Sequence, residues 1–455
     1  MRRIVLVGGV FGALCAANAA HADPHEAWQA PTLTITRADE DWSDLSDAQK
    51  RSHHWTGPFK YVPLGNDEDW LSTGIELRAR SEDFANNLWG DAPAPDDGYV
   101  WLRALPYADL HLRHWRAFAQ PILATSIGVA PASGPVDETG IDILQGFVEA
   151  DYGSFRARAG RQMVSLGTER LVGTRYGPNV PLAFDGLRLD TQLGTADIAA
   201  LALRPVRPGT GNFDDRTSSD ETLWGLYASL PDLDLYYLGY RNDAASWGAR
   251  SGRETRHSLG ARWHGNRDDW HWNIEGVYQF GRFAGGSISA WTLGNELGRS
   301  FPALPMKPDL TLRANVVSGD GNARDGQLGT FNALFPKGKY FGELSPVGPY
   351  NIVNLQPVLG LSLSPKLSAS LGAAAYWRYS TADGIYDIPG NLVRAPGASH
   401  ARYIGTEVEA GISWQATAEL ELSASVSSFS AGPFIRETGR ARAIRMFGLE
   451  SNFRF

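Results

Sequence analysis

The final fifteen residues of the chain, 441–455, alternate between apolar and polar side chains. The odd positions carry Phe447, Leu449, Ser451, Phe453 and Phe455, and the even positions include Glu450, Asn452 and Arg454. Because successive side chains of a strand point to opposite faces, this pattern predicts a strand with one apolar and one polar face. About 9–11 such residues suffice to cross a bilayer when the strand is tilted. An edge strand of a soluble sandwich would alternate in the same way, so the other segments must discriminate between the two.

Seventeen further segments show the same period of two. They are Leu71–Arg80, Val100–Leu112, Trp115–Ala124, Asp142–Asp151, Phe155–Gln162, Asp185–Asp190, Thr195–Leu203, Thr222–Ser229, Leu233–Tyr240, His257–His264, Trp270–Phe280, Ser287–Leu297, Asp309–Ser318, Ile352–Ser362, Leu367–Tyr379, Tyr403–Trp414 and Ala418–Ser428. With the closing strand they make eighteen, an even number as expected for a bacterial single-chain outer-membrane barrel.

The connections between these segments fall into short turns and long loops. Tight turns join Asp151 to Phe155, Ser229 to Leu233 and Trp414 to Ala418, whereas 81–98, 163–184, 204–221, 319–351 and 380–402 are long and rich in Gly, Asp and Pro. Short turns at one rim and long loops at the other are typical of outer-membrane barrels. We therefore predict an all-β fold, a transmembrane antiparallel up-and-down β-barrel of about 18 strands over residues 70–455. Residues 23–69 are expected to be a periplasmic lead-in.

Residues 1–22 have the features of a secretory signal peptide. The stretch opens with two arginines, continues with an apolar run over 4–17, and ends in the small-x-small cleavage site Ala20-His21-Ala22. The single cysteine of the chain, Cys15, lies inside it, so the mature chain would contain no disulfide or metal-thiolate site. These features predict export, with cleavage near Ala22, to the outer membrane of a Gram-negative cell.

The composition is compatible with a membrane barrel. No later stretch approaches the roughly 18 consecutive apolar residues of a membrane helix, but a barrel needs no such run because its strands alternate. Fifteen Trp, sixteen Tyr and nineteen Phe could supply the aromatic girdles at the two interfaces. The formal net charge is −8 at pH 7, and acids gather in predicted loops and turns such as 67–69, 96–97, 214–215 and 220–221.

The period of two also predicts which side chains face the lumen. Leu371 and Ile404 are expected to face lipid, whereas Ser370 and Glu407 face inward, because charges are costly on the lipid face. The pore-lining candidates are mainly arginines with inward parity, interleaved with acids. They are Arg78, Arg80, Arg103, Arg156, Arg158, Arg161, Arg188, Arg262, Arg313, Arg378, Glu76, Glu149, Asp185 and Asp190.

The densest arginine cluster carries a family resemblance. Residues 155–190 read FRARAGRQMVSLGTERLVGTRYGPNVPLAFDGLRLD. Shorter supporting pieces are FKYVPLG (59–65), LSTGIELRARSE (71–82), VVSGDGN (316–322), FNALFPKGKYFGE (331–343), IGTEVE (404–409) and FSAGPFIRETG (429–439). With these residues the sequence resembles the alginate export family of outer-membrane porins over essentially the whole mature chain.

The resemblance implies an eighteen-stranded barrel whose electropositive, arginine-lined constriction passes an anionic polysaccharide, with loops or turns partly occluding the lumen. Arginine meets carboxylates bidentately, and rings of charge set pore selectivity. Interleaved acids would hold the arginines in position. The alternative for these residues is a set of structural salt bridges that fill the lumen without any solute. Expected partners are outer-membrane lipid and an anionic saccharide, with periplasmic export components left open and no nucleic acid.

Several residues remain ambiguous from sequence. Parity points Arg161 outward unless Gly160 marks a bulge. Arg170 and Arg175 fall in the loop 163–184, which either folds into the pore or is solvated. The loop 320–326, DGNARDG, resembles a calcium loop but lacks the closing acid, so a solvated loop is expected. No cofactor or metal is predicted.

Two other functions compete with an anionic-saccharide channel. A barrel-embedded hydrolase would need a nucleophile or an acid/base pair, and the chain has neither Gly-x-Ser-x-Gly nor His-Glu-x-x-His. We therefore expect no enzyme. A general porin for the uptake of small anionic or aromatic nutrients is the stronger rival, because selectivity depends on a few lumen residues rather than on the fold.

Overall fold

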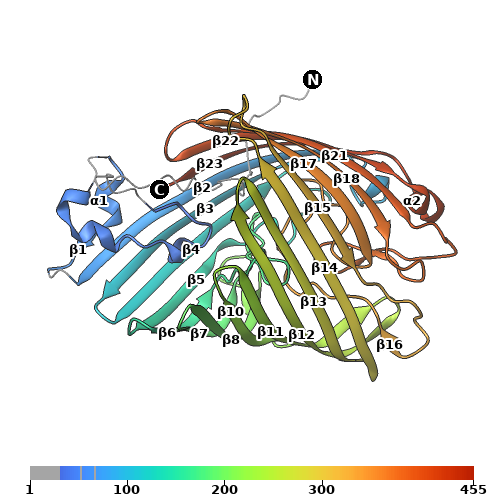
Figure 1. The fold of residues 1–455 in the computed structure, drawn as a ribbon, viewed down its shortest axis with the longest axis horizontal. Helices are drawn as coiled ribbons and strands as arrows, with labels where there is room; N and C mark the ends of the chain where they lie inside the picture. Colours follow the sequence, from blue (N-terminus) through green and yellow to red (C-terminus); the bar gives the residue numbers. More distant parts are fainter. Residues whose placement is uncertain (1–30, 52–53, 66–67) are drawn as a thin grey trace.

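The strands of the chain form one closed antiparallel barrel in the computed structural model, which describes residues 31–51, 54–65 and 68–455 (Figure 1). The predicted signal peptide, 1–22, lies outside the described residues. The eighteen wall strands are β2 Asp69–Ala85, β3 Asp97–Leu112, β4 Trp115–Ile127, β5 Gly140–Asp151, β6 Phe155–Gln162, β7 Phe184–Leu193, β8 Ala196–Arg207, β10 Glu221–Ser229, β11 Leu233–Trp247, β12 Arg250–Arg267, β13 Trp270–Phe283, β14 Gly286–Ser300, β15 Asp309–Val317, β17 Ile352–Ser364, β18 Leu367–Arg378, β21 Tyr403–Gln415, β22 Leu420–Ala431 and β23 Ile444–Arg454. Each of the eighteen predicted segments coincides with one of them.

Short elements complete the fold. They are the two-residue strands β1 Val62–Pro63, β9 Arg216–Thr217, β16 Gln327–Leu328 and β19 Ile385–Tyr386, the strand β20 Leu392–Arg394, the 3-10 helices η1 Arg37–Asp39, η2 Ser43–Ser46, η3 Ala48–Lys50 and η4 Asn87–Gly90, and the helices α1 Gly57–Lys60 and α2 Pro433–Thr438. In the described part of the chain, neither helix is long and apolar enough to cross a membrane.

The barrel closes where β2 pairs with the final strand. The register of this seam runs from Glu76 opposite Arg454 to Ala85 opposite Arg445. The predicted closing strand therefore has a partner on each side, β22 and β2, and leaves no open apolar edge. This closure decides between the barrel and the soluble sandwich in favour of the barrel.

The faces follow the predicted parity along most of the wall. Leu371 is 52% exposed on the outer surface, and Glu407 is buried inside. The prediction for Ile404 is wrong, because its side chain is fully buried inside the barrel. The cause is local: the register between β18 and β21 shifts beside Gly405, so the first residues of β21 lose the parity of the remainder.

All eight connections at the rim opposite α2 are short. They are 113–114, 152–154, 194–195, 230–232, 268–269, 301–308, 365–366 and 416–419. The other rim carries the long connections, among them 163–183, 318–351 and 379–402, although 248–249 and 284–285 are tight turns there too. Short turns mark the periplasmic rim of an outer-membrane barrel. Figure 1 shows α1 and β1 at this periplasmic end and α2 at the extracellular end.

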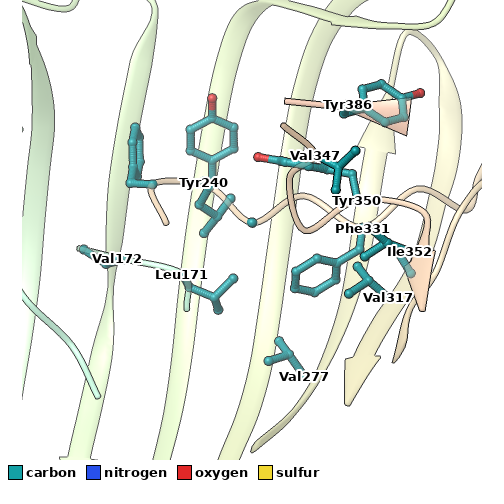
Figure 2. Close-up of a cluster of buried hydrophobic side chains, with 14 of the residues drawn as sticks. Leu171, Val172, Tyr240, Val277, Val317, Phe331, Val347, Tyr350, Ile352 and Tyr386 are labelled. Atoms are coloured by element: carbon teal, nitrogen blue, oxygen red, sulfur yellow. The ribbon is translucent and has the colours of Figure 1, made fainter. Parts of the chain in front are cut away.

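The apolar core lies inside the barrel rather than between layers. Residues of the long connections, such as Val172, Phe331 and Tyr350, pack against inward-facing side chains of the wall such as Tyr240 and Val277 (Figure 2). A lumen filled with water would leave these side chains wet, so their burial shows that two extracellular connections fold inward. We call 163–183 the first crossing loop and 329–351 the second crossing loop.

Candidate functional site: the lumen and its two crossing loops

The first crossing loop begins where β6 ends, and glycines permit its departure from the wall. Gly160 has φ +132° and Gly186 has φ +152°. A Cβ at Gly160 would lie 2.4 Å from the carbonyl oxygen of Gly146, and one at Gly186 would lie 2.2 Å from that of Ala202. Only glycine accommodates such close approach of neighbouring strands.

Residues 176–179 of the first crossing loop are held against the seam of the barrel. Arg78 donates to the carbonyl oxygen of Gly177 at 2.7 Å, and Arg103 donates to those of Pro178 and Asn179 at 3.2 Å each. Tyr176 of the loop donates its hydroxyl to Glu76 at 2.5 Å. The guanidinium groups of β2 and β3 therefore act as anchors for loop carbonyls.

Arg170, in the first half of the same loop, reaches the opposite wall. Arg170 donates to Glu275 of β13 at 3.0 Å, to Asn315 of β15 at 3.0 Å, and to Tyr340 of the second crossing loop at 2.7 Å. Tyr236 of β11 also donates to Glu275, at 2.5 Å. Because these two parts of the loop are fixed on opposite sides of the wall, the loop spans the lumen.

The second crossing loop also spans the lumen and joins the first. Arg256 of β12 donates to the carbonyl oxygen of Thr330 at 3.1 Å, while Glu343 pairs at 2.9 Å with Arg80 of β2. Main-chain hydrogen bonds connect the two loops: Gly173 donates to Phe335, whose own N–H donates to Leu171, each at 2.8 Å. The two loops therefore form one hydrogen-bonded layer across the interior.

The predicted charged residues of β2 and β3 lie beneath this layer. All four are buried: Glu76 is 1% exposed, Arg78 and Arg80 are 2% exposed, and Arg103 is 3% exposed. Arg103 pairs with Glu76 at 2.7 Å and Arg78 with Glu450 at 2.8 Å. Their guanidinium groups are bound by groups of the protein itself. This agrees with the alternative that these residues form structural salt bridges.

Arginines of β6 and β7 are also paired. Arg158 meets Glu149 at 2.7 Å and Arg188 meets Asp190 at 2.8 Å, both with inward parity. Arg161 pairs with Asp185 at 3.0 Å.

The interpretation of Arg161 and Asp185 as lumen residues requires correction. The β6 register shows no shift at Gly160, so Arg161 keeps the parity opposite to that of Arg158, and Asp185 the parity opposite to that of Arg188. Thr217 of β9 donates to Asp185 at 2.5 Å. This pair belongs to the extracellular edge of the wall rather than to the pore surface.

The remaining predicted arginines have different environments. Arg262 pairs with Asp234 at 2.7 Å, and Arg313 pairs with Glu296 at 2.7 Å while staying about one-third exposed. Arg378 is fully buried, donates to the carbonyl oxygens of connection 379–402, and lies 3.9 Å from the ring centroid of Phe434. It holds the extracellular loops together and has no lumen surface.

Three cations of the lumen have side chains that form no hydrogen bond or ion pair with any described residue. They are Arg156 on β6, Arg175 on the first crossing loop and Lys337 on the second. Arg156 is exposed, and the Nε of Arg175 is buried without a partner. Cations that the protein itself does not neutralise are the ones available to an anion.

Arg175 and Lys337 have electrostatic neighbours at different heights of the barrel. Those of Arg175 include Glu221 and Asp387, at the extracellular end of β10 and in the connection 379–402. Those of Lys337 include Glu296 and Arg313, in the periplasmic half of β14 and in the middle of β15. Burial, followed by the charge of Arg313, lowers the pKa of Lys337.

The sequence leaves the positions of Arg170 and Arg175 undecided and does not single out Lys337 or Arg256. The length of the two connections is one signal of loops that fold inward, but a long solvated loop can have the same polar composition. The apolar residues Phe331, Phe335 and Phe341 within the second connection were the stronger indication, because a solvated loop has no use for them.

One cluster of three carboxylates could hold a cation. Asp142, Asp214 and Asp215 bring ligand oxygens within 4.8 Å of one another near the extracellular rim, and this is the one such group in the described residues. The main-chain N–H of Asp215 already donates to Asp142 at 3.1 Å, and the guanidinium of Arg161 lies 3.6 Å from the carboxylate of Asp142.

The loop 320–326 is held at one end by Asp383, whose carboxylate accepts from the N–H of Asp320 at 2.9 Å.

Solved structures share this architecture. Acinetobacter baumannii OccAB1 superposes with a TM-score of 0.59 at 12% identity, over 85% of this chain and 96% of that one. A BenF-like porin from Pseudomonas fluorescens Pf-5 gives a TM-score of 0.59 at 10% identity, over 85% of this chain and 98% of that one. Pseudomonas aeruginosa OccK2 (OpdF), solved in complex with glucuronate, gives a TM-score of 0.56 at 11% identity, over 85% of this chain and 98% of that one. At such identities the likeness shows the fold.

The sequence itself identifies the family. The family profile described as alginate export matches residues 69–448, which include almost the whole barrel. No curated protein matches the chain. Family and fold are both those of passive outer-membrane channels. The chain belongs to the alginate export family and is a β-barrel channel of the Gram-negative outer membrane.

Proposed function

We propose that this channel passes anionic saccharides of the uronate type by passive diffusion through its lumen. The observation that carries the proposal is the presence in the crossing layer of Arg175 and Lys337, two cations whose side chains have no ion-pair partner among the described residues. A carboxylated solute would meet both free cations as it passes the layer.

The paired wall arginines have a supporting role in this proposal. Arg78, Arg80 and Arg103 fix the crossing loops, and thereby the positions of the two free cations. Removing solvent from around a free cation strengthens its attraction for an anion, because the effective dielectric constant falls. Few free charges also favour passage, since a solute must leave each site as readily as it enters.

Two classes of solute are compatible with the proposal: a saccharide chain and a smaller organic acid. Membership of the alginate export family favours a polysaccharide or oligosaccharide. A second candidate, a porin for small anionic or aromatic nutrients, is favoured by the two loops that cross the lumen and by the similarity in fold to OccK2, which was solved with glucuronate. Proteoliposome uptake of glucuronate against oligouronides separates the two: entry of the monomer alone supports the nutrient porin.

The test of the proposal is ion selectivity. In planar bilayers with a KCl gradient, the wild type should show a reversal potential that indicates anion preference, and uronates should block the current. Replacing Arg175→Gln together with Lys337→Gln should abolish that preference. The matched control is Arg267→Gln, at an exposed periplasmic turn where its side chain is 83% exposed. An unchanged reversal potential in the double variant would overturn the proposal.

A further inference from the structure

The segment 33–51 precedes the barrel in sequence but lies inside its periplasmic mouth. Ala38 is 2% exposed and clusters with Tyr107, Phe118 and Phe147, which face inward from β3, β4 and β5. Ile35 packs against the neighbouring inward-facing cluster that contains Leu105. A lead-in that stayed in the periplasm would have no such contacts. The periplasmic position predicted for 23–69 therefore does not describe this segment, which enters the barrel.

Polar contacts fix this segment to the wall. Arg116 of β4 donates to the carbonyl oxygen of Ala38 at 2.5 Å. Arg37 is 2% exposed, pairs with Glu40 at 2.8 Å, and donates to the main-chain oxygen of Phe455 at 2.9 Å. The segment therefore contacts both the wall and the closing strand.

Asp39 follows Ala38 in this segment, and its carboxylate accepts a hydrogen bond from the hydroxyl of Thr36 at 2.5 Å. Its side chain is exposed, although its neighbours Ala38 and Glu40 are buried. Arg116, Arg158 and Arg188, from β4, β6 and β7, all interact electrostatically with its carboxylate. The segment thus presents a carboxylate to an arginine-rich part of the wall, as an anionic solute would.

That part of the wall is close to electrical balance. Arg116, Arg158 and Arg188 are paired with Asp109, Glu149 and Asp190 respectively. Arg156, the free cation of β6, is the register partner of Asp190. Asp39 supplies a further negative charge near Arg116, Arg158 and Arg188, so its withdrawal would make the local potential more positive.

We propose that residues 33–51 form a displaceable internal plug, in which Asp39 occupies the position of a solute carboxylate at Arg116, Arg158 and Arg188. Docked, the plug fills the periplasmic mouth beside β3–β5 and repels anions from it. Displaced, it opens the mouth and exposes an electropositive wall. The identity of the competing anion rests on the proposed function, whereas the blocking by the plug does not.

Charge competition is tested with Asp39→Asn. Its anion preference in a KCl gradient should exceed that of the wild type by about twofold or more at low salt, and the difference should fade as salt screens the lumen. Asp41→Asn is the matched control, because Asp41 is an exposed acid of the same segment that accepts only from its neighbour Ser43. An Asp39→Asn channel with the selectivity of the wild type would overturn the role of Asp39.

Displacement is tested by locking the plug. Ala38→Cys with Phe118→Cys places two thiols within one buried cluster, and the only native cysteine, Cys15, lies in the predicted signal peptide. Conductance should fall when the disulfide forms and recover on reduction of the same channel. A conductance that does not respond to reduction shows a fixed lining and overturns the plug. This readout does not depend on the sign of the permeant ion, so it stays valid if the wild type proves cation-selective and the proposed function fails.

Discussion

Arg78 and Glu450 form a buried ion pair at 2.8 Å across the seam where β2 closes on β23, and the same guanidinium holds the carbonyl oxygen of Gly177. One side chain therefore joins the first wall strand, the last wall strand and the first crossing loop. Wall closure and loop position are coupled through it.

We expect Arg78→Ala to destabilise the barrel by about 3 kcal/mol, since removing one partner of a buried pair leaves the other charge uncompensated. Arg80, at 3.2 Å from Glu450, limits the loss. Equilibrium unfolding in detergent or vesicles measures it. Arg207→Ala, which removes the pairs of an exposed arginine with Asp220 and Glu221, should leave stability nearly unchanged. Equal stability of both variants with the wild type would show that the seam does not depend on this pair.

The lipid face is tested on β18. Leu371 is 52% exposed on the outer surface and Ser370 has the opposite parity. Leu371→Arg should cost about 2–4 kcal/mol if the residue lies near the bilayer midplane, and Ser370→Arg should cost much less, because its guanidinium faces the lumen. Equal losses in unfolding free energy would contradict the assignment of faces on this strand.

Charge reversal on β6 separates a free cation from a paired one. Arg156 is exposed and has no partner among the described residues, whereas Arg158 is buried against Glu149 at 2.7 Å. Arg156→Glu should reduce anion preference with little change in stability. Arg158→Glu should destabilise the barrel, because it places two carboxylates together in a buried site. Reversal potentials and unfolding curves of both variants provide the check, and a destabilised Arg156→Glu would contradict it.

The docking of the N-terminal region should depend on pH through Lys60. Burial, and then the charge of Arg37, lowers the pKa of Lys60 to about 7, while Glu40 opposes the shift. The ammonium group also faces Tyr107, to which Nζ donates at 2.7 Å. The undocked lysine, with its ordinary pKa of about 10.5, binds more protons between pH 7 and 10.5 than the docked one. Docking should therefore strengthen as pH rises from 7 toward 10 and be weakest below 7.

The anisotropy of a fluorophore at Ser43→Cys reports this docking, since Ser43 is exposed on the same segment. Anisotropy should rise between pH 7 and 9 in the otherwise native chain. Lys60→Met should remove the pH dependence while keeping most of the buried volume. A pH dependence that persists in that variant would show that Lys60 is not its source.

The sequence predicted the wall well because alternation is a local property. Each strand shows its parity within a few residues, and the wrong face predicted for Ile404 follows from a register shift that no local pattern reveals. The partners of the charged residues could not be predicted in the same way. Arg78 meets Gly177 and Glu450, both far away in sequence, and such contacts depend on the stagger of the closed barrel and on the path of a loop that resembles a solvated one.

Where the first crossing loop leaves the wall, another segment takes its place. The N–H of Phe213 donates to the carbonyl oxygen of Ile141 at 2.9 Å on β5, and β9 pairs with the end of β8. The ladder of the wall is thus completed by residues outside the crossing layer. Exchanges within 163–183 that keep the carbonyl groups bound by Arg78 and Arg103 can therefore change the crossing layer without altering the number or stagger of the strands. Under that condition the wall and the crossing layer can diversify at separate rates.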